Sequence, residues 1–233
     1  MIDIQSTRLR LQSPERQERL RALLSLRDEP AELCADLARG IIQDPTVQLR
    51  AYTCVLLGKK PCDLSLELLL KVLQEDPDHG VRADAAGALG NLEDLRAYDA
   101  LVRAFYEETE WIVRFSAIVA LGNLGDERAF SLISDALKQG DGLMQEGAIS
   151  ALGDLGDPGG VPLILPFVGS ESWMMRQKVA QALGNIGIPE TLAPLRFLAK
   201  DPAETVAQAA EAELARLANV VQVSDDKQPR IAT

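Results

Sequence analysis

The sequence has few of the residues on which most catalytic and metal sites depend. Its 233 residues include one histidine, three cysteines and only 4% aromatic residues. The cysteines, Cys34, Cys54 and Cys62, show no CxxC spacing, so we expect small buried thiols rather than a zinc site. No serine nucleophile elbow and no phosphate-binding glycine loop occurs. We therefore expect no metal and no catalytic residue, and a protein that is not an enzyme by itself.

Positive charge and long apolar runs are also scarce. The chain has 24 basic and 35 acidic residues, a formal charge of −11, which disfavours binding to a phosphate backbone. No run approaches the roughly 18 apolar residues that span a bilayer, and the start, MIDIQSTRLR, lacks the apolar segment of a signal peptide. These absences predict a cytoplasmic protein with no nucleic-acid partner that is not a membrane protein.

What the sequence does contain is an internal repeat. LLG or ALG ends at Gly58, Gly90, Gly122, Gly153 and Gly184, so the spacing between glycines is 32, 32, 31 and 31 residues. A fixed period of this length is typical of stacked helical repeats.

One repeat, residues 109–138, shows the unit most clearly. Its first half carries small or apolar residues at helical spacing, namely Val113, Ala117, Ala120, Leu121 and Leu124. After a Gly-Asp turn, a second helical stripe follows at Ala129, Ile133, Ala136 and Leu137. Two helices cannot bury both stripes alone, so repeats must stack. We predict an all-α, right-handed α-solenoid of six to seven helix pairs over residues 1–220, with a disordered tail at 221–233.

The repeated residues also resemble a known family. VRADAAGALGNLEDLRAYDAL and VRFSAIVALGNLGDERAFSLI are similar to the short HEAT-like repeats of the phycobilin lyase superfamily of cyanobacteria. The segments EETEWIVRFSAIVALGNLGD and SESWMMRQKVAQALGNIG most resemble phycobilisome-degradation proteins of the NblB type. That resemblance implies phycobiliprotein subunits (phycocyanin, allophycocyanin) as partners, a second degradation factor as another, and a location in the cytoplasm, at the thylakoid surface.

The resemblance leaves three functions open. The first is a HEAT-repeat binding protein that promotes phycobilisome disassembly or chromophore detachment. The second is a phycobilin lyase subunit that attaches or transfers bilin. The third is an interaction adaptor, such as a partner of an iron-sulfur scaffold. No cofactor is required by the first function, and phycocyanobilin is the ligand that the resemblance implies.

An arginine recurs at one position of the repeat. Arg50, Arg82, Arg114 and Arg176 occupy it, and Gln145 interrupts the series. One interpretation is architectural: each guanidinium binds a carboxylate in a turn between helices, such as Asp94, Asp126 or Asp157. The other is that Arg82, Arg114 or Arg176 binds a carboxylate of a ligand, because a bilin carries two propionates.

Three residues before the arginine, the same alignment places His79, Trp111, Gly142 and Trp173. In HEAT-type stacks this helix is the inner one, so the resemblance puts both tryptophans along a rim of the binding surface. Each ring either covers a neighbouring helix end or is an exposed anchor for a chromophore or a protein.

The acidic residues beside Trp111 admit two interpretations as well. Glu107, Glu108 and Glu110 are either a solvated helix start or a site in which a carboxylate pairs with a protonated bilin nitrogen. From this cluster we predict Glu107 and Glu110 as binding residues, together with the two tryptophans, the three arginines and His79.

Overall fold

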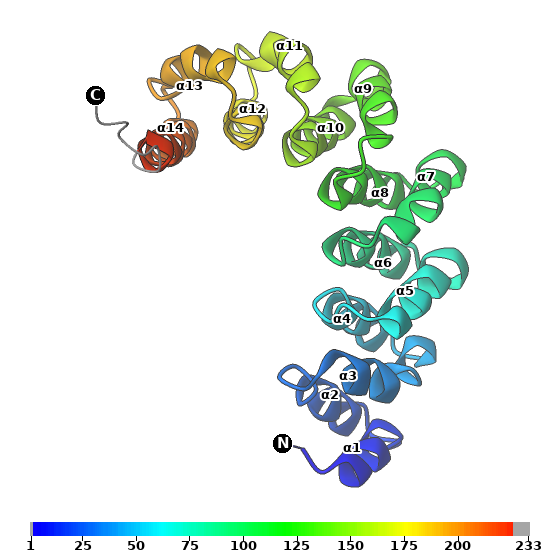
Figure 1. The fold of residues 1–233 in the computed structure, drawn as a ribbon. Helices are drawn as coiled ribbons and strands as arrows, with labels where there is room; N and C mark the ends of the chain where they lie inside the picture. Colours follow the sequence, from blue (N-terminus) through cyan, green and yellow to red (C-terminus); the bar gives the residue numbers. More distant parts are fainter. Residues whose placement is uncertain (1, 226–233) are drawn as a thin grey trace. The chain divides into compact units, whose positions relative to one another are not determined.

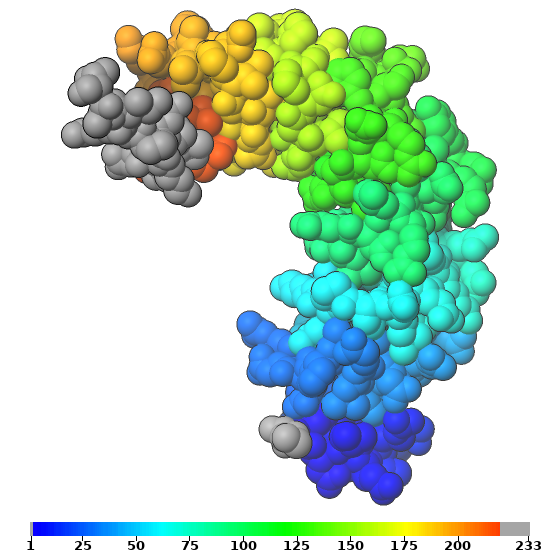
Figure 2. All heavy atoms as spheres, in the orientation of Figure 1, coloured from blue at the N-terminus to red at the C-terminus, as the bar shows by residue number. Residues whose placement is uncertain are grey.

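The structure is a computed structural model that describes residues 2–225, and every regular element in that range is a helix. The chain forms two compact units, Met1–Asp126 and Glu127–Thr233. Each unit is a stack of helix pairs in two rows (Figures 1 and 2). The prediction of an all-α solenoid of HEAT-like repeats is thus confirmed.

In the first unit the front row is α4, α6 and α8, and the back row is α3, α5 and α7 (Figure 1). The helices of this unit are α1 (Ile4–Leu11), α2 (Arg16–Leu24), α3 (Ala31–Ala38), α4 (Val47–Leu57), α5 (Asp63–Glu75), α6 (His79–Asn91), α7 (Tyr98–Glu107) and α8 (Trp111–Leu124), with 3-10 turns η1 (Ile41–Gln43) and η2 (Leu95–Ala97). Within the front row, α4 packs on α6 and α6 packs on α8.

In the second unit the front row is α10, α12 and α14, and α9, α11 and α13 form the back row. Its helices are α9 (Ala129–Gln139), α10 (Gly142–Leu155), α11 (Val161–Ile164), α12 (Trp173–Ile186), α13 (Leu192–Leu198) and α14 (Glu204–Asp225), with 3-10 turns η3 (Pro158–Gly160), η4 (Leu165–Phe167) and η5 (Pro189–Thr191). The helix α14 extends past residue 220, where the sequence analysis placed the start of a tail, and residues 226–233 lie outside the described range.

Both stripes predicted in residues 109–138 are buried. All nine side chains named for them are less than 9% exposed: Val113, Ala117, Ala120, Leu121, Leu124, Ala129, Ile133, Ala136 and Leu137. Small residues dominate these stripes because the helices of one row pack closely.

The repeated glycine marks the closest approach between neighbouring front-row helices. A Cβ atom added to Gly90 would lie 2.7 Å from the Cα of Ala120, and one added to Gly58 would lie 2.8 Å from the Cα of Ala88. Any side chain at these glycines would push one helix away from the next. The period seen in the sequence is therefore the period of helix contacts.

Candidate functional site

A buried arginine joins consecutive repeats in the first unit. Arg50 donates from Nε and Nη2 to both carboxylate oxygens of Asp76, at 2.7 and 2.9 Å, and from Nη1 to the backbone oxygen of Asp44, at 2.9 Å. The two side chains are 9% and 3% exposed. We call this arrangement an arginine clamp: an arginine, a carboxylate 25 or 26 residues later, and a carbonyl oxygen six residues earlier.

The clamp recurs at three further arginines. Arg19 binds Asp44 and the carbonyl of Ser13, Arg82 binds Glu108 and the carbonyl of Asp76, and Arg176 binds Asp201 and the carbonyl of Ser170. In the first unit the clamps share residues, because Asp44 and Asp76 each accept from two successive arginines. They form one continuous network from Arg19 to Glu108.

The architectural interpretation of the arginines is therefore correct, but the expected carboxylates were wrong. Asp94 instead binds Arg96, and Asp157 caps η3 by accepting from the backbone N–H of Gly159. The carboxylates that the clamps use lie at the start of the turn after the next back-row helix. Glu108, which we did not single out as a binding residue, is one of them.

Carboxyl pKa values follow from the clamps. Burial alone would raise the pKa of Asp44, but hydrogen bonds from Arg19 and Thr46 outweigh it and lower the pKa. The hydrogen bond from Arg176 lowers the pKa of Asp201. A carboxyl group whose pKa is lower in the folded than in the unfolded chain stabilises the fold above its unfolded pKa, near 4. This stabilisation is lost as the pH falls through the folded pKa.

We therefore expect the melting temperature to fall as the pH is lowered from about 5 to about 3. The double variant Asp44→Asn/Asp201→Asn should start from a lower melting temperature at pH 6 and then show a weaker dependence on pH. Thermal unfolding followed by circular dichroism at several pH values measures both effects. Asp36→Asn is the control, because its carboxylate makes an exposed ion pair with Arg8. Equal pH dependence in the double variant and in the parent would contradict the assignment.

Two repeats lack the sequence for a clamp. Counting 25 or 26 residues from Arg114 reaches Gln139 or Gly140, neither of which is acidic. Arg114 instead donates from Nε to the backbone oxygen of Phe105 at 3.1 Å, and its guanidinium carbon lies 5.3 Å from the centre of the Phe105 ring. In the next repeat Gln145 replaces the arginine and donates to the carbonyl of Leu137. Arg114 is thus the ladder arginine whose position is not explained by a clamp.

Both tryptophans are exposed at the first residue of a front-row helix. Trp111 begins α8 and is 56% exposed, and its ring meets the edge of Phe115 with 6.5 Å between ring centres. Trp173 begins α12 and is 46% exposed, beside Met174, which is 50% exposed. Neither ring is buried against a helix end, so both have the accessibility that a binding anchor requires.

The remaining predicted residues separate into two places in the first unit. Glu110 is the N-cap residue of α8, directly before Trp111, and His79 is the exposed first residue of α6. Arg82 and Glu107 instead line a cleft of about 530 Å³ between α5 and α7, which also contains Arg103 and Glu108. The structure therefore groups Trp111, Arg114 and Glu110 at the start of α8, away from this cleft.

The cysteines have the environment of packing residues. Cys34 and Cys54 are buried, and this burial raises the pKa of their thiols to about 11 and about 12. Cys62 is half-buried and accepts a hydrogen bond from the backbone N–H of Ser65 at the start of α5. Within residues 2–225, no cluster of three His, Cys, Asp or Glu residues could hold a metal ion, and no helix is both long and apolar enough to cross a lipid bilayer.

Comparisons with solved structures identify the same fold elsewhere. The chain is similar to the complex of CpcE and CpcF of phycocyanin lyase from Nostoc sp. PCC7120, with a TM-score of 0.65 and 21% identity over 96% of this chain and 95% of that one. It is also similar to YIBA of E. coli, with a TM-score of 0.55 and 14% identity over 92% and 93% of the two chains. At these identities the likeness concerns the fold.

Sequence comparison adds the family. No curated protein matches the chain. Family models described as HEAT repeats match residues 34–122, 66–144 and 131–215. Together these matches extend from residue 34 to residue 215, which includes both described units apart from their outer ends. With the two-row stacking and the repeated glycine contacts, they show that the chain belongs to the HEAT-repeat family.

Proposed function

We propose that this HEAT-repeat protein binds phycobiliproteins and their bilins and promotes phycobilisome disassembly or chromophore detachment, as in the NblB type that its repeats resemble. The fold it shares with the phycocyanin lyase complex supports the proposal. Its partners are then phycocyanin and allophycocyanin subunits, together with a second degradation factor. Its place is in the cytoplasm, where phycobilisomes lie on the thylakoid surface.

The observation that carries the proposal is the cluster at the start of α8. Trp111 offers an exposed aromatic face, Glu110 lies directly before it, and Arg114 lies one helical turn later. A bilin needs three kinds of contact: a flat apolar surface, a carboxylate for its protonated pyrrole nitrogens, and a cation for its propionates. The cluster provides one residue of each kind. In the second unit, Trp173 with Arg176 repeats part of this arrangement, although the Arg176 guanidinium is already held by Asp201.

Titration with holo-phycocyanin tests this function. We expect a complex that co-elutes in size-exclusion chromatography and a change in bilin absorbance, with tryptophan fluorescence quenched because the chain has only two tryptophans. Trp111→Ala and Trp173→Ala should each weaken binding about 10- to 30-fold while the melting temperature stays within a few degrees of the parent.

Phe197→Ala is the matched control. Phe197 is also a strongly exposed aromatic residue, at 65%, but it lies on the back-row helix α13. It should therefore leave binding unchanged. An unaltered bilin spectrum without co-elution would remove the proposal, and a large loss of thermal stability in both tryptophan variants would make the rings packing residues.

A lyase subunit is the second candidate, and the shared fold with the CpcE–CpcF complex favours it. It predicts that free phycocyanobilin is attached to an apo-phycobiliprotein when this chain is mixed with a partner chain. The absorbance assay distinguishes the two functions, because attachment consumes free bilin whereas detachment releases it. If only an iron-sulfur scaffold co-purified and no phycobiliprotein bound, the adaptor function would replace both.

A further inference from the structure

The solvent face of the front row differs between the two units. On each front-row helix, the positions that face solvent recur every four residues from the first residue of the helix. In the second unit these positions are mostly polar: Glu146, Ser150 and Asp154 on α10, and Gln177, Gln181 and Asn185 on α12. This is the composition expected of a helix face that meets only water.

In the first unit the same positions are apolar or small. On α4 they are Val47 and Val55, which are 36% and 46% exposed. On α8 they are Trp111, Phe115 and Val119, none of which is buried. Because exposed apolar residues in a contiguous patch mark interaction surfaces, this difference needs an explanation that solvation does not give.

The helix between them, α6, carries only small residues at the corresponding positions. These are Ala83 and Gly87, and a Cβ atom added to Gly87 would meet no atom within 4 Å. The side chains of α4 and α8 therefore rise on both sides of a bare stretch of α6. Neighbouring helix axes lie about 8–10 Å apart, so α4 and α8 leave a space above α6 about as wide as one more helix.

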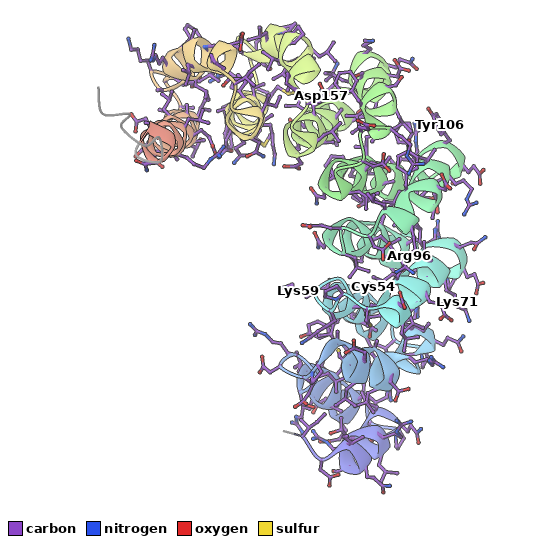
Figure 3. The ribbon with its side chains drawn as sticks, viewed as in Figure 1. Cys54, Lys59, Lys71, Arg96, Tyr106 and Asp157 are labelled. Atoms are coloured by element: carbon purple, nitrogen blue, oxygen red, sulfur yellow. The ribbon has the colours of Figure 1, made fainter. Side chains whose placement is uncertain are left out.

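One charged side chain interrupts this apolar surface. Asp84 on α6 is exposed and, among the described residues, makes no hydrogen bond or ion pair. Burial of part of its surface and repulsion from Asp78 raise the pKa of its carboxyl, so a nearby cation would be favourable. Figure 3 places Lys59 at the end of α4 on this row, while Tyr106 lies on the back-row helix α7.

We propose that the surface formed by α4, α6 and α8, which we call the α6 face, binds an α-helix of another protein, with an apolar stripe against Ala83 and Gly87 and a lysine or arginine against Asp84. Main-chain pairing is excluded because the face offers no strand edge, whereas an amphipathic helix supplies apolar residues at the spacing of the face. The carboxylate fixes which way the partner lies, because one ion pair within an apolar surface favours a single register. This inference adds a binding mode to the proposed function and holds for any partner that presents such a helix.

A synthetic peptide tests it without bilin or phycobiliprotein. The probe is an alanine-based helix of about 16 residues with a leucine stripe and one central lysine. A second peptide has glutamate in place of that lysine. Binding is followed by the anisotropy of the labelled peptide and by the fluorescence of Trp111 in a Trp173→Phe background. We expect the lysine peptide to bind about tenfold more tightly than the glutamate peptide.

Variants of α6 locate the site. Gly87→Leu fills the space above α6 and should weaken binding at least about tenfold, while Asp84→Asn should abolish the preference for lysine. The matched control is Ser150→Leu, which adds the same side chain at the equivalent position of α10. The proposal is overturned if neither peptide binds, if Gly87→Leu binds as well as Ser150→Leu, or if the lysine preference survives in Asp84→Asn. Because phycocyanin is absent, the result is independent of the titration described above.

Discussion

Replacing Arg50 by methionine is expected to lower the free energy of unfolding by about 3–5 kcal/mol, because it leaves the carboxylate of Asp76 buried without its partner. The side chain of Asp76 is only 3% exposed, so water cannot replace the two hydrogen bonds that the guanidinium donates. The same substitution also removes the donor to the carbonyl of Asp44. Urea unfolding at neutral pH measures the loss.

A double variant separates the ion pair from its desolvation. Arg50→Met/Asp76→Leu removes both charges, and an apolar pair of similar volume is often close to neutral relative to a buried ion pair. The double variant should therefore be more stable than Arg50→Met alone. If the two variants were equally unstable, the loss would come from disrupted packing and from the unsatisfied carbonyl, and not from the unpaired carboxylate.

Adding a single methyl group to Gly90 should destabilise the first unit by about 1–3 kcal/mol. The new Cβ atom of Gly90→Ala would lie 2.7 Å from the Cα of Ala120, which belongs to the backbone of α8 and cannot rotate away. To relieve the overlap, α6 and α8 must move apart along their whole contact. The melting temperature of the variant measures the effect.

The same substitution one turn earlier is the control. Gly87 lies on the same helix, but an added Cβ atom there meets nothing within 4 Å. Gly87→Ala should therefore stabilise the protein by about 0.5–1 kcal/mol, because alanine has the higher helix propensity. Should both alanine variants shift stability in the same direction, the contact between glycine and the next helix would not determine the spacing.

The period of the sequence predicted most of the fold, because it identifies equivalent residues in every repeat. The stripe from Val113 to Leu124 is buried as expected, and the repeated glycine lies at each front-row contact. The period does not say which residues of neighbouring repeats touch. For this reason Arg50 was expected to bind a carboxylate in a turn within the repeat, whereas its partner is Asp76, at the end of the next back-row helix.

The site was predicted less completely than the fold. Aligning the repeats identified Trp111 and Trp173 as equivalent residues, but their exposure depends on how the first turn of each helix projects. The α6 face was also missed, although its signal is in the alignment: Val55, Gly87 and Val119 occupy a position that is Ser150 and Gln181 in the second unit. Comparing solvent positions between repeats, and not only buried ones, would have shown it.

The arginine clamp has a consequence for how such a chain can lengthen. The acceptor of each clamp lies near the start of one repeat and the donor lies six residues later, as with Asp76 and Arg82. A tandem duplication of this segment would place a new acidic residue where the earlier arginine needs it and a new arginine ready for the repeat that follows. Gene duplication therefore yields a copy that is already complementary to both neighbours, without any compensating mutation.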